Sequence, residues 1–167
     1  MQIRAELKCD QEAVRAINSS AFETPLEANF VDALRRQVQA IVSLVAEDNG
    51  EIVGHIMFSP VTLSGHPNLK VMGLAPMAVA LAHQNKGFGS ALVEAGLDQC
   101  RQLGFEAIVV LGHPDYYPRF GFLPASRFGI NSEYDVPDEV FMAMELQPEA
   151  LNMKTGNVRY HPAFSNE

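Results

Sequence analysis

The spacing of apolar residues in the first quarter of the chain predicts one strand and two helices. Residues 2–7 alternate between apolar and charged side chains, which is the period of a half-buried strand. Asp10 can cap the helix that follows. The apolar face of that helix comprises Ala13, Val14, Ile17 and Ala21. After a loop, a second helix is expected from Leu26 to about Val38, and its inward residues are Phe30, Val31 and Leu34.

A hairpin follows the two helices. Residues 41–47 and Ile52–Phe58 are apolar runs on either side of Asn49-Gly50, a strong signal for a two-residue turn. The second strand is expected to continue past Pro60 to Leu63, before another turn at residues 65–68.

The long apolar run over residues 71–80 predicts a buried central strand. Pro76 within this run removes a ladder donor, so we expect a bulge there. A helix is predicted from about Gly87 to Leu103, where Gly104 ends it, and Ala107–Leu111 forms the next strand. This strand-helix-strand order predicts a parallel pair.

The whole pattern predicts the α/β class. A further strand is expected over Val140–Leu146, and the tail from Pro148 is less regular, with Val158, Tyr160 and Phe164 packed onto the sheet. Residues 1–167 are expected to form a single domain, with a mixed, mostly antiparallel sheet and helices on both of its faces.

Composition narrows the function classes. The formal net charge is -8, with 12 Lys and Arg against 20 Asp and Glu, which argues against nucleic acid as a main partner and mildly favours a cationic substrate. No apolar run approaches the roughly 20 residues of a membrane span, and the charged, alternating start is not typical of a signal peptide. Cys9 and Cys100 lack metal spacing and are read as reduced thiols of a cytoplasmic protein.

Candidate chemistry begins at the turn Gln84–Gly89, which joins the central strand to the long helix. The first N–H groups of a helix have no intrahelical partner and attract anions. Gly87 and Gly89 allow close approach of a phosphate, and Lys86 adds a cation. The spacing fits neither a P-loop nor a dinucleotide fingerprint. What remains, Q-x-x-G-x-G after an apolar strand, resembles the pyrophosphate loop of the GNAT superfamily of N-acetyltransferases.

A second segment strengthens this resemblance. The string G-H-P-D-Y-Y-P-R-F-G-F-x-P-A, from Gly112 to Ala125, is similar to the YhbS-like branch of bacterial acetyltransferases, and together the two segments extend the resemblance over essentially the whole chain. In this superfamily a tyrosine four residues before a Gly-Phe pair commonly acts as general acid on the departing coenzyme A thiolate. Tyr117 stands at that position, and Tyr116 is expected to be the packing residue of the pair.

The resemblance implies a splayed parallel strand pair, residues 74–80 and 106–111, with the acetyl-pantetheine arm between them. Acetyl-CoA is the implied co-substrate, and no metal is implied. The implied cofactor contacts are the backbone of Met77, Ala78 and Val79, the loop residues Gln84, Asn85, Lys86, Gly87, Phe88 and Gly89, and the hydroxyl of Ser90.

The general base is left open by the residues. Many superfamily members carry a carboxylate on the central strand, and Leu74–Ala80 has none. The candidates are Glu23, Glu27, His113 and Asp115, and a water chain or an amine that arrives neutral would also serve.

The sequence therefore predicts an acetyl-CoA-dependent N-acetyltransferase that transfers the acetyl group directly to a primary amine within a ternary complex. The sequence does not determine whether the acceptor is a small-molecule or a protein amine, nor whether the chain forms a homodimer. There are two alternatives to this prediction. One is a regulatory module that binds CoA or acyl-CoA without turnover. The other is an enzyme that uses a longer acyl donor, and the space beside Met77 and Val79 would determine which acyl chain fits.

Overall fold

A computed structural model describes residues 1–22, 26–37 and 41–160 of the chain. The chain divides into two compact units, of which the first contains Met1–Ser59 with Ala75–Gln99 and the second contains residues 60–74 with 100–160. Strands β3 (Glu51–Leu63) and β4 (His66–Val79) each contribute residues to both units.

The strands of the first unit form an antiparallel meander. Strand β1 (Gln2–Ala5) pairs with β2 (Val42–Asp48), and β2 pairs with β3 in a register that runs from Val42↔Phe58 to Asp48↔Glu51. Asn49 and Gly50 close the hairpin with φ values of 53° and 81°, as the two-residue turn requires. The predicted hairpin is confirmed.

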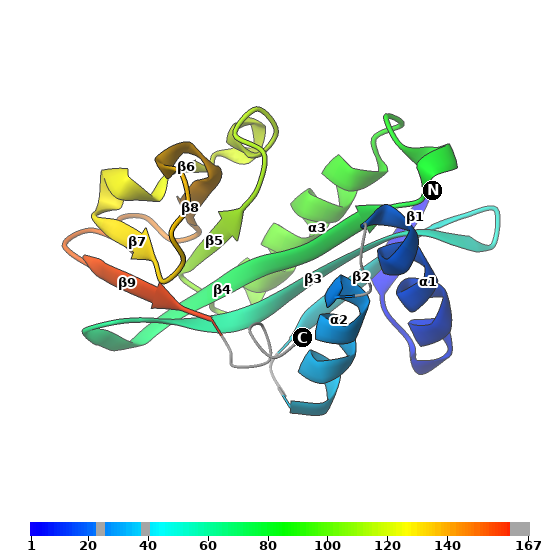
Figure 1. Cartoon of the computed structure of the whole chain (residues 1–167), viewed down its shortest axis with the longest axis horizontal. Coiled ribbons are helices and arrows are strands. Elements are labelled where there is room, and N and C mark those ends of the chain that lie inside the picture. The colour runs from blue at the N-terminus through cyan, green and yellow to red at the C-terminus, as the bar shows by residue number, and fades with distance from the viewer. Residues whose placement is uncertain (23–25, 38–40, 161–167) are drawn as a thin grey trace. The chain divides into compact units, whose positions relative to one another are not determined.

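Helices cover both faces of these strands (Figure 1). Met57 packs in one cluster with residues of α1 (Gln11–Ala21) and α2 (Leu26–Gln37), whereas Phe58 lies against Gly96 of α3 (Phe88–Gln102). Adjacent residues of a strand point to opposite faces, so α3 lies on the face opposite to α1 and α2. The first cluster comprises Val14, Phe30, Val31, Leu34, Val45 and Met57. In the described ranges, no helix is long and apolar enough to cross a membrane.

The second unit contains the predicted parallel pair. Strand β5 (Ala107–Leu111) runs parallel to β4 in a register from Val71↔Ala107 to Leu74↔Val110. Its other edge pairs antiparallel with β8 (Phe141–Glu145), and β8 pairs with the short β6 (Leu123–Pro124).

The same unit contains a second pair of parallel strands, which the sequence did not predict. Strand β7 (Ile130–Ser132) runs parallel to β9 (Gly156–Arg159), and β9 also pairs antiparallel with the end of β3. Val158 is buried in the core of this unit and Tyr160 packs against that core, as expected, while Phe164 lies outside the described residues.

Three local predictions need correction. The first strand ends at Ala5 rather than at residue 7, and β4 begins at His66, within the turn expected over residues 65–68. Asp10 makes no side-chain cap on α1, because its carboxylate accepts instead from the Arg4 guanidinium, at 2.7 and 3.2 Å, and from the Leu7 amide, at 2.7 Å. The Arg4 hydrogen bond lowers the pKa of Asp10.

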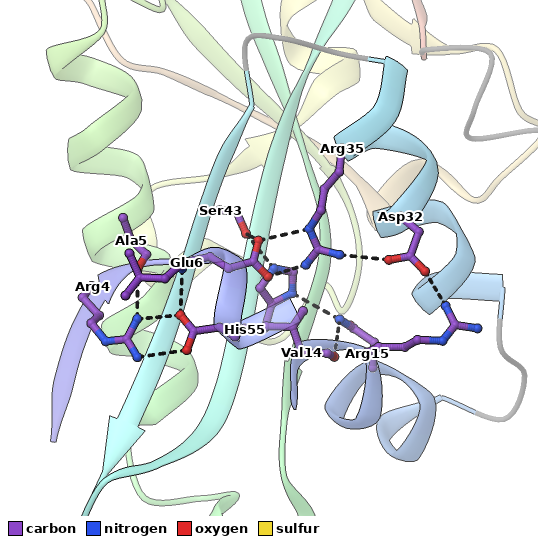
Figure 2. Close-up of polar contacts among 12 residues, drawn as sticks. Arg4, Ala5, Glu6, Val14, Arg15, Asp32, Arg35, Ser43 and His55 are labelled. Carbon is purple, nitrogen blue, oxygen red and sulfur yellow. Dashed lines mark hydrogen bonds and ion pairs between the residues drawn. The ribbon is translucent and has the colours of Figure 1, made fainter. Parts of the chain in front are cut away.

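The first unit also holds a chain of buried and half-buried polar residues (Figure 2). His55 on β3 is fully buried, with Asn18 Nδ2 3.2 Å from its Nδ1 and Ser43 Oγ 2.9 Å from its Nε2. Ser43 lies 3.1 Å from Glu6, and Arg35 of α2 forms an ion pair with the same carboxylate. The chain thereby ties both N-terminal helices to the strands.

The donors and acceptors in this chain fix the proton of His55. The Asn18 amide nitrogen also donates to the carbonyl of Val14 and can only donate, so Nδ1 of His55 accepts. The proton therefore sits on Nε2 and is donated to Ser43, whose hydroxyl proton goes to Glu6. Burial, and secondarily the charge of Arg35, lowers the pKa of His55 to about 3, so the ring is neutral near pH 7.

We expect this buried ring to make folding pH-dependent. An unfolded His55 takes up a proton near pH 6.5, whereas the folded one stays neutral until about pH 3. The unfolded state binds more protons in that window, so the free energy of unfolding should fall by up to about 1.4 kcal/mol for each pH unit as the pH drops from 6.5 towards 3.

Denaturant unfolding of the wild type and of His55→Gln at several pH values measures this effect. The variant loses stability at pH 7, but its stability should depend less on pH because it lacks the His55 imidazole. Asp10 and the other histidines contribute equally to both proteins, so the difference between the two profiles reports on His55. Parallel pH profiles would contradict the assignment.

Candidate functional site

The junction between β4 and α3 is built from backbone hydrogen bonds of the first unit. Strand β4 ends at Val79, a 3-10 turn spans Leu81–His83, and α3 begins at Phe88. The amide of Ala80 donates to Val53 on the neighbouring strand at 2.8 Å, and Gln84 Nε2 returns to the carbonyl of Val79 at 3.1 Å. The glutamine of the motif therefore anchors the loop to the strand end.

Two left-handed residues turn the chain into the helix. Asn85 has a φ of 62° and Gly87 a φ of 88°. Asparagine tolerates this region through its short polar side chain, whereas most other side chains would be strained there. A β-carbon on Gly87 would meet no atom within 4 Å, so the space beside this residue is open.

The first amides of α3 are available at this point. The Ala91 amide donates to the Gly87 carbonyl at 3.1 Å, and the amides of Phe88 and Gly89 lie in the first turn, where the N–H groups of a helix have no intrahelical partner. Lys86 is exposed beside them. Amide hydrogens, the helix dipole and a lysine together form a site suited to an anion such as a diphosphate.

The Phe88 side chain fixes where the helix starts. It is 6% exposed and meets the His83 ring edge to face, with the ring centroids 5.8 Å apart. The Phe88 ring is thus a packing group, and its backbone amide alone is left as a donor for the candidate anion site. The role of His83 was missed from the sequence, although it directly precedes the motif.

The end of β4 supplies the other predicted cofactor contacts. Ala78 is buried, while Met77 and Val79 are half-buried. Their positions lie beyond Leu74, where the described pairing of β4 with β5 ends. The peptide bond between Ala75 and Pro76 is cis, and the bulge expected at Pro76 stays a prediction.

In the second unit, the turn after β5 holds Tyr117. The residue is 7% exposed, and its ring meets Tyr116 and Phe122 edge to face, with centroid separations of 5.1 and 5.7 Å. Burial raises the pKa of its phenol to about 12, with a smaller effect of Tyr116. Tyr117 therefore keeps its proton at neutral pH and can donate a hydrogen bond.

The expectation that Tyr116 packs while Tyr117 serves only as the acid needs correction. Tyr116 is only half-buried and carries the Arg119 guanidinium 4.5 Å from its ring centroid, so it packs as expected. Tyr117, however, is the more buried of the two and is itself enclosed by aromatic rings. Its side chain must be counted as a packing group as well as a candidate acid.

The candidate bases differ in their surroundings. Glu27 lies in the first turn of α2 and is half-buried, and its Oε2 is buried without a hydrogen-bond partner among the described residues. His113 and Asp115 are exposed in the turn after β5. Glu23 lies outside the described residues. An unsatisfied buried carboxylate oxygen needs an explanation, and a bound ligand or water is one.

No group of three or more His, Cys, Asp or Glu side chains that could hold a metal ion occurs in the part of the chain that the structure describes.

Comparison with known proteins gives the family. Residues 11–122 match the model of the Acetyltransferase (GNAT) family. The uncharacterized N-acetyltransferase YhbS of Escherichia coli K12 is 36% identical over 166 residues, which is 99% of each chain.

Two solved structures are also similar. The crystal structure of E. coli YhbS in complex with CoA has a TM-score of 0.94 at 35% identity, with 99% of this chain and 92% of that chain covered. A GNAT acetyltransferase from Brucella melitensis in complex with acetyl-CoA has a TM-score of 0.81 at 35% identity, with 98% and 97% covered. On these matches, over a mixed α/β fold with the β4–β5 parallel pair, the chain belongs to the GNAT family of N-acetyltransferases.

Proposed function

We propose that this enzyme transfers an acetyl group from acetyl-CoA directly to a primary amine within a ternary complex. The observation that carries the proposal is the start of α3, where the amides of Phe88 and Gly89 and the open space at Gly87 suit the diphosphate of coenzyme A. The CoA and acetyl-CoA bound in the two similar crystal structures support the choice of ligand.

The donor would lie along the loop and the end of β4. The diphosphate is assigned to Gln84, Asn85, Lys86, Gly87, Phe88, Gly89 and Ser90, and the pantetheine arm to the backbone of Met77, Ala78 and Val79. The described pairing of β4 with β5 ends at Leu74, and beyond that residue the backbone amides and carbonyls on this edge of β4 could pair with an extended ligand. An amide near Val79 would donate to the thioester carbonyl and stabilise the oxyanion that forms on it.

The reaction then follows from the thioester. The neutral amine nitrogen attacks the carbonyl carbon, a C–N bond forms, and the C–S bond breaks after the tetrahedral intermediate. The nitrogen releases one proton to a base, and the sulfur gains one proton, so acetyl-CoA and amine become amide and free CoA.

Tyr117 is assigned to the leaving sulfur. A phenol of pKa about 12 is a weak acid towards a thiolate whose conjugate acid has a pKa of about 8.5. Tyr117 is therefore best suited to donate a strong hydrogen bond to the developing thiolate, with solvent completing the protonation. Such a contact is made mainly in the transition state and acts on kcat.

Glu27 is the best supported base or acceptor contact, because its buried Oε2 lacks a partner among the described residues. A carboxylate there can receive the proton of an acceptor ammonium group. His113, which is exposed, is the alternative.

The diphosphate assignment predicts that Gly87→Ala weakens CoA binding. An alanine with a φ near +88° costs about 1–2 kcal/mol, so the loop rotates away from the geometry that presents its amides. We expect the Kd for CoA, measured by isothermal titration calorimetry, to rise about tenfold.

Gly50→Ala is the matched control, since Gly50 has a φ of 81° and equally open surroundings but lies in the β2–β3 hairpin. It should cost similar thermal stability and leave the Kd unchanged. Equal losses of affinity in both variants would argue against the loop.

The thiolate contact predicts that Tyr117→Phe lowers kcat about a hundredfold, the size expected for one donor to a developing charge. The KM for acetyl-CoA should change less than about threefold, since ground-state binding is kept. The measurement is a thiol-release assay on an amine identified from a panel.

Tyr134→Phe serves as a control for loss of a phenol elsewhere in the second unit. A Tyr117→Phe enzyme with full kcat would remove Tyr117 from the mechanism. Binding of acetyl-CoA without turnover on any amine would favour the regulatory alternative.

For the base, Glu27→Gln keeps the shape of the side chain but cannot take a proton, so kcat/KM for the amine should fall about tenfold or more. The same assay on His113→Gln gives the comparison. A large loss of kcat/KM in His113→Gln, together with full activity in Glu27→Gln, would make His113 the base in place of Glu27.

A further inference from the structure

Gly112 directly follows β5, and its backbone φ does not explain why a glycine occupies this position. Its φ lies outside the left-handed region, unlike that of Gly87 or Gly104. Its φ therefore does not require glycine, and the space beside it offers another reason.

That space is filled by the ring of Tyr117. A β-carbon on Gly112 would lie 3.0 Å from Cδ2 of Tyr117 and closer still to Cε2. Side-chain carbons do not pack at such distances, so either the backbone or the ring would have to move.

The backbone is held on one side. The Gly112 amide donates to the Val140 carbonyl at 2.9 Å, immediately after the β5–β8 ladder that ends at Leu111↔Phe141. Retreat of Gly112 would break this bond and disturb the strand pair. The collision would therefore be relieved mainly by the ring.

The ring is held by its aromatic neighbours. Tyr116 and Phe122 meet it edge to face, Phe122 is 1% exposed, and Arg119 lies over the Tyr116 ring. Arg119 Nε also donates to the Tyr116 carbonyl at 2.9 Å, which ties the guanidinium to the turn. Gly112 and Phe122 thus leave one place for the Tyr117 ring and determine where its hydroxyl points.

We propose that Gly112, together with Phe122, is a positioning residue for Tyr117: its missing side chain provides the space that holds the phenol where it can meet the leaving sulfur. This inference rests on the proposed role of Tyr117 in acetyl transfer. In this proposal Gly112 acts through the tyrosine.

The test is a double-mutant cycle of wild type, Gly112→Ala, Tyr117→Phe and the double variant in the thiol-release assay. Gly112→Ala should lower kcat about tenfold or more, as misplacement of a catalytic group does, while the KM for acetyl-CoA changes less than about threefold. In the Tyr117→Phe background the same substitution should change kcat less than about twofold. Equal effects in both backgrounds, or full kcat in Gly112→Ala, would overturn the proposal.

Gly96→Ala is the matched control for overpacking against an aromatic ring, because its β-carbon would lie 2.6 Å from Cζ of Phe58 in the first unit. It should lower the melting temperature without the dependence on Tyr117. If Gly112→Ala does not fold, Phe122→Leu takes its place in the cycle, since it frees the ring from the other neighbour named in the proposal, with the same expected and contrary outcomes.

Absorbance titration adds a readout that does not depend on turnover. The tyrosine signal that Tyr117→Phe removes should titrate near pH 12 in the wild type and closer to 10 in Gly112→Ala, as the ring leaves its buried place. A Tyr117→Phe enzyme with full kcat would remove the proposed function of Tyr117 and the positioning role with it. A slow Tyr117→Phe enzyme beside a normal Gly112→Ala enzyme would overturn the positioning role alone.

Discussion

The hydrogen-bonded turn between β4 and α3 is the constraint on which the candidate donor site depends. Gln84 returns to Val79, Asn85 and Gly87 take left-handed conformations, and the Phe88 ring is buried. These interactions fix the first amides of α3 before any ligand arrives. A preorganised set of donors costs little to order on binding, so the proposed diphosphate site would need few charged side chains.

Tyr117 is constrained by packing instead of by the backbone. Burial keeps its phenol protonated and makes it a weak acid, and for that reason the role proposed for it is a hydrogen bond to sulfur and not full proton transfer. The glycine at position 112 and the phenylalanine at 122 give the ring its place. The contacts that pack this turn are therefore the same contacts on which the proposed role of Tyr117 depends.

The buried polar chain around His55 serves a different purpose in the first unit. It joins α1 through Asn18 and α2 through Arg35 to strands β2 and β3. The donors of Asn18, His55 and Ser43 each meet an acceptor, whereas Asn18 Oδ1 is buried without a hydrogen-bond partner among the described residues. The arrangement is specific to one tautomer of His55. Since α2 also carries Glu27, the same chain holds the helix of the candidate base against the strands.

The sequence by itself determined the local elements and the loop. The Asn49-Gly50 hairpin, the β4–α3–β5 crossover with its parallel pair, the apolar faces of α1 and α2 and the α/β class all follow from periodicity and turn residues, and the structure confirms them. The Q-x-x-G-x-G and Tyr-to-Gly-Phe spacings predicted the family, which the comparisons confirm. Only the tertiary structure decided the β7–β9 pair, the pairing of Asp10 with Arg4, the burial of Tyr117 and the position of its ring beside Gly112. Periodicity reports that a side chain is buried, whereas its partner depends on residues that are distant in the chain and meet only on folding.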